Sequence, residues 1–327
     1  MKSKRALSGI QPSGKLHLGN LVGALSNWVK LQEKYECFYF IADIHALTTG
    51  YADTGRLKEN IMDVALDMLS AGLDPERSTL FIQSDIPEHS ELHLMFSMIT
   101  PLPWLERIPT YKAQIEELKG KDLGTYGFLG YPVLQAADIL IYKADVVPVG
   151  QDQLPHLELT REIARRFNHF YKEVFPLPKD LLTEAPVLPG LDGRKMSKSY
   201  NNTIAISDPP EVIINKIGEA ITDPARIKKG DKGHPEVCTI FAYHKIFNKD
   251  EVRQISLDCS SAKIGCVECK KNIAKKIIDR LAPIYEKRKT LEKTKDHVRE
   301  VFNEGSKKAQ VIARQTLLEA KKAMGIL

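Results

Sequence analysis

The first 200 residues alternate short apolar runs with stretches of helical periodicity, and this alternation limits the fold more than any other feature. Strands are expected at residues 5–10, 37–42, 79–83 and 145–149, and a last one is expected to begin near Val187. After the first strand, and again over residues 57–69, apolar residues recur every three or four positions, as on the buried face of a helix. The sequence therefore predicts an α/β fold, a Rossmann-like parallel sheet covered by helices.

The alternation is interrupted once and then ends. Residues 87–121 hold several prolines and no helical period, which favours a connective insertion between two halves of the sheet. Beyond Pro209 and Pro210 the patterns are helical, and no strand is expected. We predict a sheet domain over residues 1–200 and an all-helical domain over residues 201–327.

Composition restricts the compartment and the partners. The basic start is followed by an apolar stretch that Gln11, Pro12 and Gly14 interrupt, which excludes a signal peptide or membrane span there and makes the cytoplasm the expected location. From Lys263 to Leu327 there are 17 Lys plus Arg against 8 Asp plus Glu. This basic segment is either a solvated helical surface or a surface for a polyanion.

Two separated segments carry the features of a phosphate site. Gln11-Pro12-Ser13-Gly14-Lys15-Leu16-His17-Leu18-Gly19-Asn20 is a tight turn that leads from the first strand into a helix N-terminus, where free N–H groups can bind an anion. Gly193-Arg194-Lys195-Met196-Ser197-Lys198-Ser199 offers two lysines three residues apart. Each could arise by chance, but their pairing on a βα framework favours a nucleotide site.

Together the two segments resemble the signatures of class I aminoacyl-tRNA synthetases. His17 to Asn20 stands for the His-Ile-Gly-His motif, and Lys195 to Ser199 matches the KMSKS motif. Asn20 replaces the second histidine, as is frequent among tryptophanyl-tRNA synthetases. The resemblance covers nearly the whole chain and implies a catalytic domain, a helical anticodon-binding domain and a homodimer.

A third segment, residues 131–140, resembles the amino-acid pocket of the tryptophanyl enzymes. Asp138 stands among apolar residues and must find donors, and an indole N–H is a suitable one; the alternative is a capping or ion-paired aspartate. Gln135 departs from the frequent Met and approaches the pattern of tyrosyl-tRNA synthetases. His45, after the second strand, is either a core residue or a pocket residue.

The resemblance implies a role for each matching position. Tyr131 and Gln153 would hold the α-amino group, with Val147 and Val149 on the ring faces and Asp138 on the indole nitrogen. His17, Lys195 and Lys198 would stabilise charge on the phosphates. The expected ATP contacts are Gln11, Pro12, Ser13, Gly19, Asn20, Gly150, Gln151, Asp152, Val187, Lys195, Met196, Ser197, Lys198 and Ser199.

Four of the five cysteines crowd into one segment: Cys238, Cys259, Cys266 and Cys269. Four thiolates suit zinc or an iron–sulfur cluster, and unligated thiols are the alternative. The spacing resembles that of bacterial tryptophanyl-tRNA synthetases with a 4Fe–4S cluster, so iron–sulfur is preferred to Zn²⁺. Cys37, inside an apolar strand, is expected to be a small buried residue.

The expected reaction is activation of L-tryptophan by ATP with Mg²⁺, followed by transfer to tRNA(Trp). A tyrosyl-tRNA synthetase-like ligase is one alternative. A nucleotidyltransferase of the same fold should lack the Asp138 pocket and the basic helical domain. A catalytically silent tRNA-binding or amino-acid-binding protein would have little use for Lys195 and Lys198.

Overall fold

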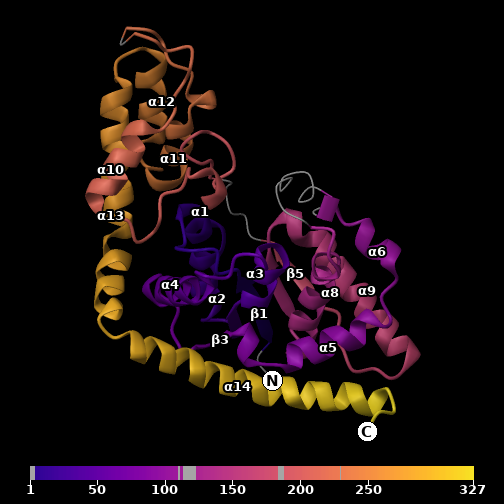
Figure 1. Ribbon diagram of the computed structural model, residues 1–327. Coiled ribbons are helices and arrows are strands. Elements are labelled where there is room, and N and C mark those ends of the chain that lie inside the picture. Colours follow the sequence, from indigo (N-terminus) through magenta and orange to yellow (C-terminus); the bar gives the residue numbers. More distant parts are fainter. Residues whose placement is uncertain (1–3, 110, 113–122, 183–187, 229) are drawn as a thin grey trace.

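The apolar runs form one parallel sheet in the computed structural model, which describes residues 4–109, 111–112, 123–182, 188–228 and 230–327 (Figure 1). Its strands are β1 (Arg5–Ile10), β2 (Glu36–Ile41), β3 (Ser78–Ile82), β4 (Val146–Val149) and β5 (Lys179–Leu182). Their order is β3-β2-β1-β4-β5, and all neighbours are parallel. The predicted α/β fold is confirmed.

Helices cover both faces of the sheet because β1 to β4 bury apolar side chains on both sides. On β2, Cys37 and Tyr39 face one core, whereas Phe38 and Phe40 face the other. The first core is closed by α1 (Leu18–Asn20), η1 (Leu21–Leu25), α2 (Ser26–Leu31) and α4 (Leu57–Ser70). The second is closed by α5 (Glu88–Ser97), α8 (Tyr126–Ile141) and α9 (Leu154–Phe170). Cys37 is buried as expected.

Four predicted strands agree with the observed ones to within one residue at each end. The last strand is different, because β5 lies upstream of Val187, which is outside the described residues. Lys179 and Asp180 are exposed on this strand at the edge of the sheet. An edge strand with charged side chains carries no apolar run, so the periodicity gave no signal for it.

Residues 87–121 were expected to have no helical period, yet their described part begins with α5 and α6 (Leu102–Glu106). Helix α5 packs between α8 and α14 (Lys295–Ala323). Its apolar residues therefore face two neighbours and form no single stripe. The interpretation of residues 87–121 as a connective insertion stays a prediction.

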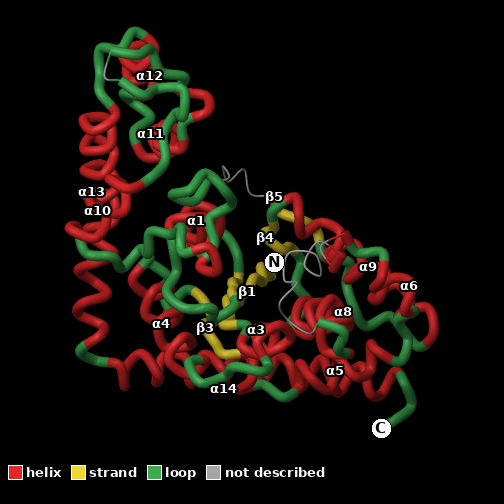
Figure 2. Tube along the Cα trace, turned by 45° about the horizontal axis from the view of Figure 1, so that its top comes forward, coloured by secondary structure: helices red, strands yellow, loops and turns green. Residues whose placement is uncertain are grey.

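The described residues after Pro209 form helices and no strand, as predicted. They are α10 (Pro210–Glu219), η5 (Pro235–Val237), α11 (Thr239–Phe247), α12 (Val252–Ser260), α13 (Cys266–Glu292) and α14. Figures 1 and 2 show α10 to α13 as an arm beside the sheet, from which α14 returns along β3 and α5. The division near residue 200 stays a prediction. Nowhere in the described chain is a helix both long and apolar enough to cross a membrane.

Candidate active site

A cavity of about 500 Å³ opens where β1 and β4 lie side by side. The chain leaves β1 toward β2 on one side, whereas β4 and β5 lie on the other side, so the strand order changes direction here. Loops diverge at such a point, which makes it the usual ligand crevice of an open parallel sheet. Residues from both strands, such as Gly9 and Val147, line the cavity.

Most of the predicted pocket residues meet around this cavity. The lining includes Gln11, Asn20, His45, Tyr131, Gln135, Asp138, Val147, Val149, Gly150, Asp152 and Gln153. Gln151 and Asp152 are exposed in the turn η3 (Gln151–Gln153) directly after β4. The resemblance predicts these residues together, and the end of β4 brings Gly150, Asp152 and Gln153 to the cavity.

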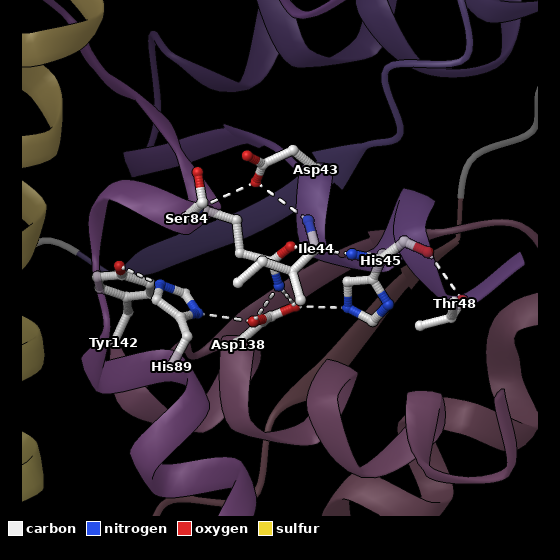
Figure 3. A network of polar contacts seen from close by, with 9 residues as sticks. Asp43, Ile44, His45, Thr48, Ser84, His89, Asp138 and Tyr142 are labelled. Atoms are coloured by element: carbon white, nitrogen blue, oxygen red, sulfur yellow. Dashed lines mark hydrogen bonds and ion pairs between the residues drawn. The ribbon is translucent and has the colours of Figure 1, made fainter. Parts of the chain in front are cut away.

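Asp138 lies at the buried end of the cavity, with 1% of its surface exposed. Figure 3 shows His45 and His89 approaching its carboxylate from opposite sides, at 2.8 Å from His45 Nε2 and 2.6 Å from His89 Nδ1. Gln83 Nε2 donates to both oxygens at 2.8 and 3.0 Å. Asp138 is thus not a helix cap; it is a buried acceptor held by three side chains, two of them histidines at ion-pair distance.

This network keeps Asp138 ionised. Burial by itself would raise the pKa of the carboxyl, but the hydrogen bonds from His45 and His89 outweigh it and lower the pKa to about 2. His89 Nε2 lies 2.7 Å from the hydroxyl of Tyr142. Burial raises the pKa of that phenol well above its ordinary value, so Tyr142 keeps its proton. Because an ionised Asp138 can only accept, His89 donates to it through Nδ1.

Three members of this network, Gln83, His89 and Tyr142, were not found from the sequence. They come from η2 (Gln83–Asp85), α5 and the end of α8. His89 falls in the segment interpreted as an insertion, so no local pattern marked it. His45 was expected to be either a core residue or a pocket residue, and it is both, because it is buried and also lines the cavity.

Other parts of the wall were missed as well. The Tyr131 hydroxyl lies 2.8 Å from Nε2 of His156, a buried histidine that also lines the cavity. Gly9 faces the ring of Phe40, and a Cβ there would lie 2.5 Å from it. The position of Gly9 at the carboxyl end of the first strand is the signal that could have identified it.

The first signature folds into a reciprocal helix cap. His17 Nδ1 accepts from the backbone N–H of Asn20 at 3.4 Å, and Asn20 Oδ1 accepts from the backbone N–H of His17 at 3.0 Å. Burial and the charge of Lys198 lower the pKa of His17 to about 4. A neutral His17 that accepts at Nδ1 carries its proton on Nε2, where it can donate to a phosphate oxygen.

The second signature contacts the first, as the pairing of the two motifs predicts. Lys198 Nζ donates to Ser13 Oγ at 3.1 Å and to the Gly14 carbonyl at 2.7 Å. Met196 is buried against the same turn, with its sulfur 3.6 Å from where a Cβ on Gly19 would stand. Two segments 180 residues apart therefore form one surface.

Asn202 holds the second signature in shape. Its Oδ1 accepts from the Ser197 N–H at 2.8 Å, and its Nδ2 donates to the Lys195 carbonyl at 3.1 Å and to Asp192. The side chain of Lys195 is exposed. Val187 and the Ser199 side chain lie outside the described part of the structure, so their predicted ATP contacts stay predictions.

The four crowded cysteines lie between the turn η5 and the start of α13. Each is partly buried, and Cys259 is 3.7 Å from Nη1 of Arg226. Burial and the three other thiols raise the pKa of Cys269 to about 12. The thiols are thus close enough to repel one another as thiolates, although the described residues contain no ready-formed group of three or more metal-binding side chains.

Comparison with known proteins agrees with this geometry. Residues 2–282 match the family model of class I tRNA synthetases, described as W and Y. The chain therefore belongs to the class I tRNA synthetase family.

Within that family, it is similar to proteins named for tryptophan. It is 52% identical to the tryptophan–tRNA ligase of Thermotoga maritima over 99% of both chains, and 46% identical to that of Aquifex aeolicus over 98% of this chain and all of the relative. The tryptophanyl-tRNA synthetase from Campylobacter jejuni complexed with ADP and tryptophan superposes with a TM-score of 0.87 at 36% identity, covering 98% of this chain and 99% of that one.

Proposed function

We propose that this chain is a tryptophan–tRNA ligase. The tryptophan carboxylate attacks the α-phosphate of ATP, the bond to pyrophosphate breaks, and the tryptophanyl-adenylate stays bound. A ribose hydroxyl of tRNA(Trp) then attacks the carbonyl carbon and releases AMP. The observation that carries the proposal is the contact of Lys198 with the first signature beside the cavity that ends at Asp138.

Asp138 is the proposed acceptor for the indole N–H. An ionised carboxylate has about four acceptor sites; His45 and His89 take one each and Gln83 Nε2 contacts both oxygens, so an indole N–H would take the place of one Gln83 contact. Because the network holds the carboxylate ionised, a substrate that displaces a Gln83 contact without bringing a donor of its own leaves an acceptor unpaired, at a cost of about 1–3 kcal/mol. This is the proposed basis of amino-acid selection, together with Tyr131 and Gln153 on the α-amino group.

His17, Lys195 and Lys198 are the proposed catalytic side chains for activation. ATP enters with Mg²⁺, which neutralises phosphate charge when bound. His17 Nε2–H and the ammonium of Lys198 lie on the same turn and would stabilise the negative charge that grows on the phosphates. Positioning and charge suffice for in-line displacement, so no covalent nucleophile is required.

The remaining assignments follow the family. We place the catalytic domain at residues 1–200 and an anticodon-binding domain at residues 201–327, whose basic segment binds the RNA. The chain acts in the cytoplasm as a homodimer. Lys112 stands where the family has a lysine that contacts phosphate, and it is the proposed contact for pyrophosphate. The family usually has a second lysine two residues later; here that position is Gln114, which lies outside the described residues.

The test is ATP–pyrophosphate exchange by the purified protein with MgATP, with tryptophan, tyrosine or no amino acid, before any tRNA is added. Exchange with tryptophan alone is the expected result. Exchange with tyrosine would favour the tyrosyl alternative, to which Gln135 points. No exchange would favour a silent binding protein. The variant Asp138→Asn should lose tryptophan-dependent exchange, while exposed Asp296→Asn on α14 serves as the control.

We also propose that Cys238, Cys259, Cys266 and Cys269 hold a metal centre, with a 4Fe–4S cluster preferred to Zn²⁺. Burial and the neighbouring thiols raise the pKa values of Cys259 and Cys269, which a bound cation would oppose because it favours thiolates. Around them lie apolar residues such as Phe241, Ile255 and Ile264, which shield such a centre from water. The cluster would stabilise the arm and take no part in the chemistry.

Anaerobic purification followed by iron, sulfide and zinc analysis tests this. We expect about four iron atoms per chain and visible absorbance, both absent from Cys259→Ser and both kept in Cys37→Ser. One zinc per chain in place of iron would favour the alternative metal. Four free thiols with no metal would refute the centre.

A further inference from the structure

A buried ion-pair cluster joins the arm to the first signature. Arg288, on α13, is 2% exposed, and Asp67, on α4, is fully buried. The guanidinium of Arg288 bonds Asp67 Oδ1 through Nη1 and lies 2.5 Å from Asp63 Oδ1 through Nη2. Its Nε donates to Glu292 at 2.9 Å. Every nitrogen of this arginine therefore has an acceptor.

The second carboxylate oxygen of Asp67 faces the turn of the first signature. Asp67 Oδ2 accepts from the backbone N–H of Leu16 at 2.7 Å, and Leu16 immediately precedes His17. Leu16 is 1% exposed, so this N–H has no access to water, and its acceptor decides where the turn lies. Arg288 fixes one oxygen of the carboxylate while the other holds the turn.

The same carboxylates act on the second signature. Asp67 and Asp63 raise the pKa of Lys198, against the stronger lowering by burial. They therefore favour the charged ammonium that bonds Ser13 and Gly14. The cluster supports one signature by a hydrogen bond and the other by charge.

Helix α13 connects this cluster to the cysteines. It begins at Cys266 and holds Arg288 near its other end, 22 residues later, which is roughly 33 Å along a helix. It also packs against α4, which carries Asp63 and Asp67. A displacement of the arm therefore moves Arg288 directly.

We propose that Arg288 and Asp67 are positioning residues for ATP: they hold the turn that precedes His17 and make its position depend on the arm through α13. The inference rests on the proposed function for its kinetic readout. Neither residue contacts the cavity, and both act through Leu16 and Lys198.

The experiment compares Arg288→Met and Asp67→Asn with Arg161→Met, a control that removes a similarly multiply paired arginine from α9. MgATP binding is measured by calorimetry without amino acid, and exchange kinetics give separate KM values for ATP and tryptophan. We expect both cluster variants to weaken MgATP binding and raise KM for ATP tenfold or more. KM for tryptophan should change less than twofold, and the control should change neither.

A double variant, Asp67→Leu with Arg288→Met, separates positioning from stability. An apolar pair of similar size often replaces a buried ion pair without loss of stability, but it leaves the Leu16 N–H without its acceptor. A folded double variant with tenfold weaker MgATP binding supports the proposal. One that binds MgATP like the wild type overturns it, as does an equal loss for ATP and tryptophan. If the wild type binds MgATP but exchanges with no amino acid, the proposed function fails while the titrations still decide the role of the pair.

Discussion

At the scale of single residues, burial lowers the pKa of both His17 and Lys198 but leaves them with different charges at neutral pH. Both pKa values are lowered, but His17 at about 4 is neutral at pH 7, whereas Lys198 at about 8 is still mostly charged. The first side chain is therefore a neutral donor, and the second is a cation that titrates within the range of ordinary assays. Of these two side chains, only Lys198 changes its charge above neutrality.

The pH profile of activation should show this asymmetry. We expect kcat/KM for ATP, which reports the free enzyme, to fall as pH rises through about 8, since Lys198 then loses its proton. In Lys198→Arg the alkaline limb should disappear, because a guanidinium does not titrate there. Its persistence in that variant would show that another group is responsible.

Residues found from the sequence share one property, which is that a contiguous motif holds them. Tyr131 and Asp138 are of this kind. Gln83 and His89 reach Asp138 from 55 and 49 residues away, and Arg288 reaches Asp67 from 221 residues away. No periodicity relates such partners, so the residues proposed to touch substrate could be named from the sequence, whereas those that orient them could not.

At the scale of elements, the sequence predicts the helices and strands whose burial leaves a regular pattern of apolar residues. The strands β1 to β4 are apolar runs between two cores, and α4 carries a clear apolar stripe. Neither β5 at the sheet edge nor α5 between two helices has such a pattern. The elements that pack against a helix or strand decide which of its faces are buried. The local pattern of apolar residues carries no information about those partners.

Helix α14 depends on one glycine where it crosses β3. A Cβ on Gly305 would stand 1.8 Å from the carbonyl oxygen of Leu80, so the helix and the strand must separate to accept it. We expect Gly305→Ala to lower the free energy of unfolding by about 1–3 kcal/mol, as overpacking does. Gly218→Ala on α10, where a Cβ meets nothing within 4 Å, should be neutral or stabilising. Urea unfolding measures both; a Gly305→Ala variant as stable as the wild type would mean that α14 shifts freely.

At the scale of the whole molecule, the basic segment divides between two places. Its first part lies on the arm with the cysteines, and its last part is α14 along the sheet (Figure 1). Both parts expose lysines, so composition does not distinguish an RNA surface from a solvated helix. The arrangement favours the arm, because α13 connects it through Arg288 and Asp67 with the turn of the first signature.

Salt dependence should separate the two parts. One variant replaces three exposed lysines of the arm by alanine: Lys263, Lys271 and Lys275. The control replaces three exposed lysines of α14: Lys307, Lys308 and Lys322. Removing one lysine that pairs with a phosphate should reduce the slope of log affinity for tRNA(Trp) against log salt concentration by about one. The arm variant should therefore bind tRNA(Trp) more weakly, with a slope smaller by about two to three. The control should bind like the wild type. Pyrophosphate exchange without RNA should be equal in the wild type and both variants. If the RNA affinity of the control falls as far as that of the arm variant, the RNA surface extends along α14.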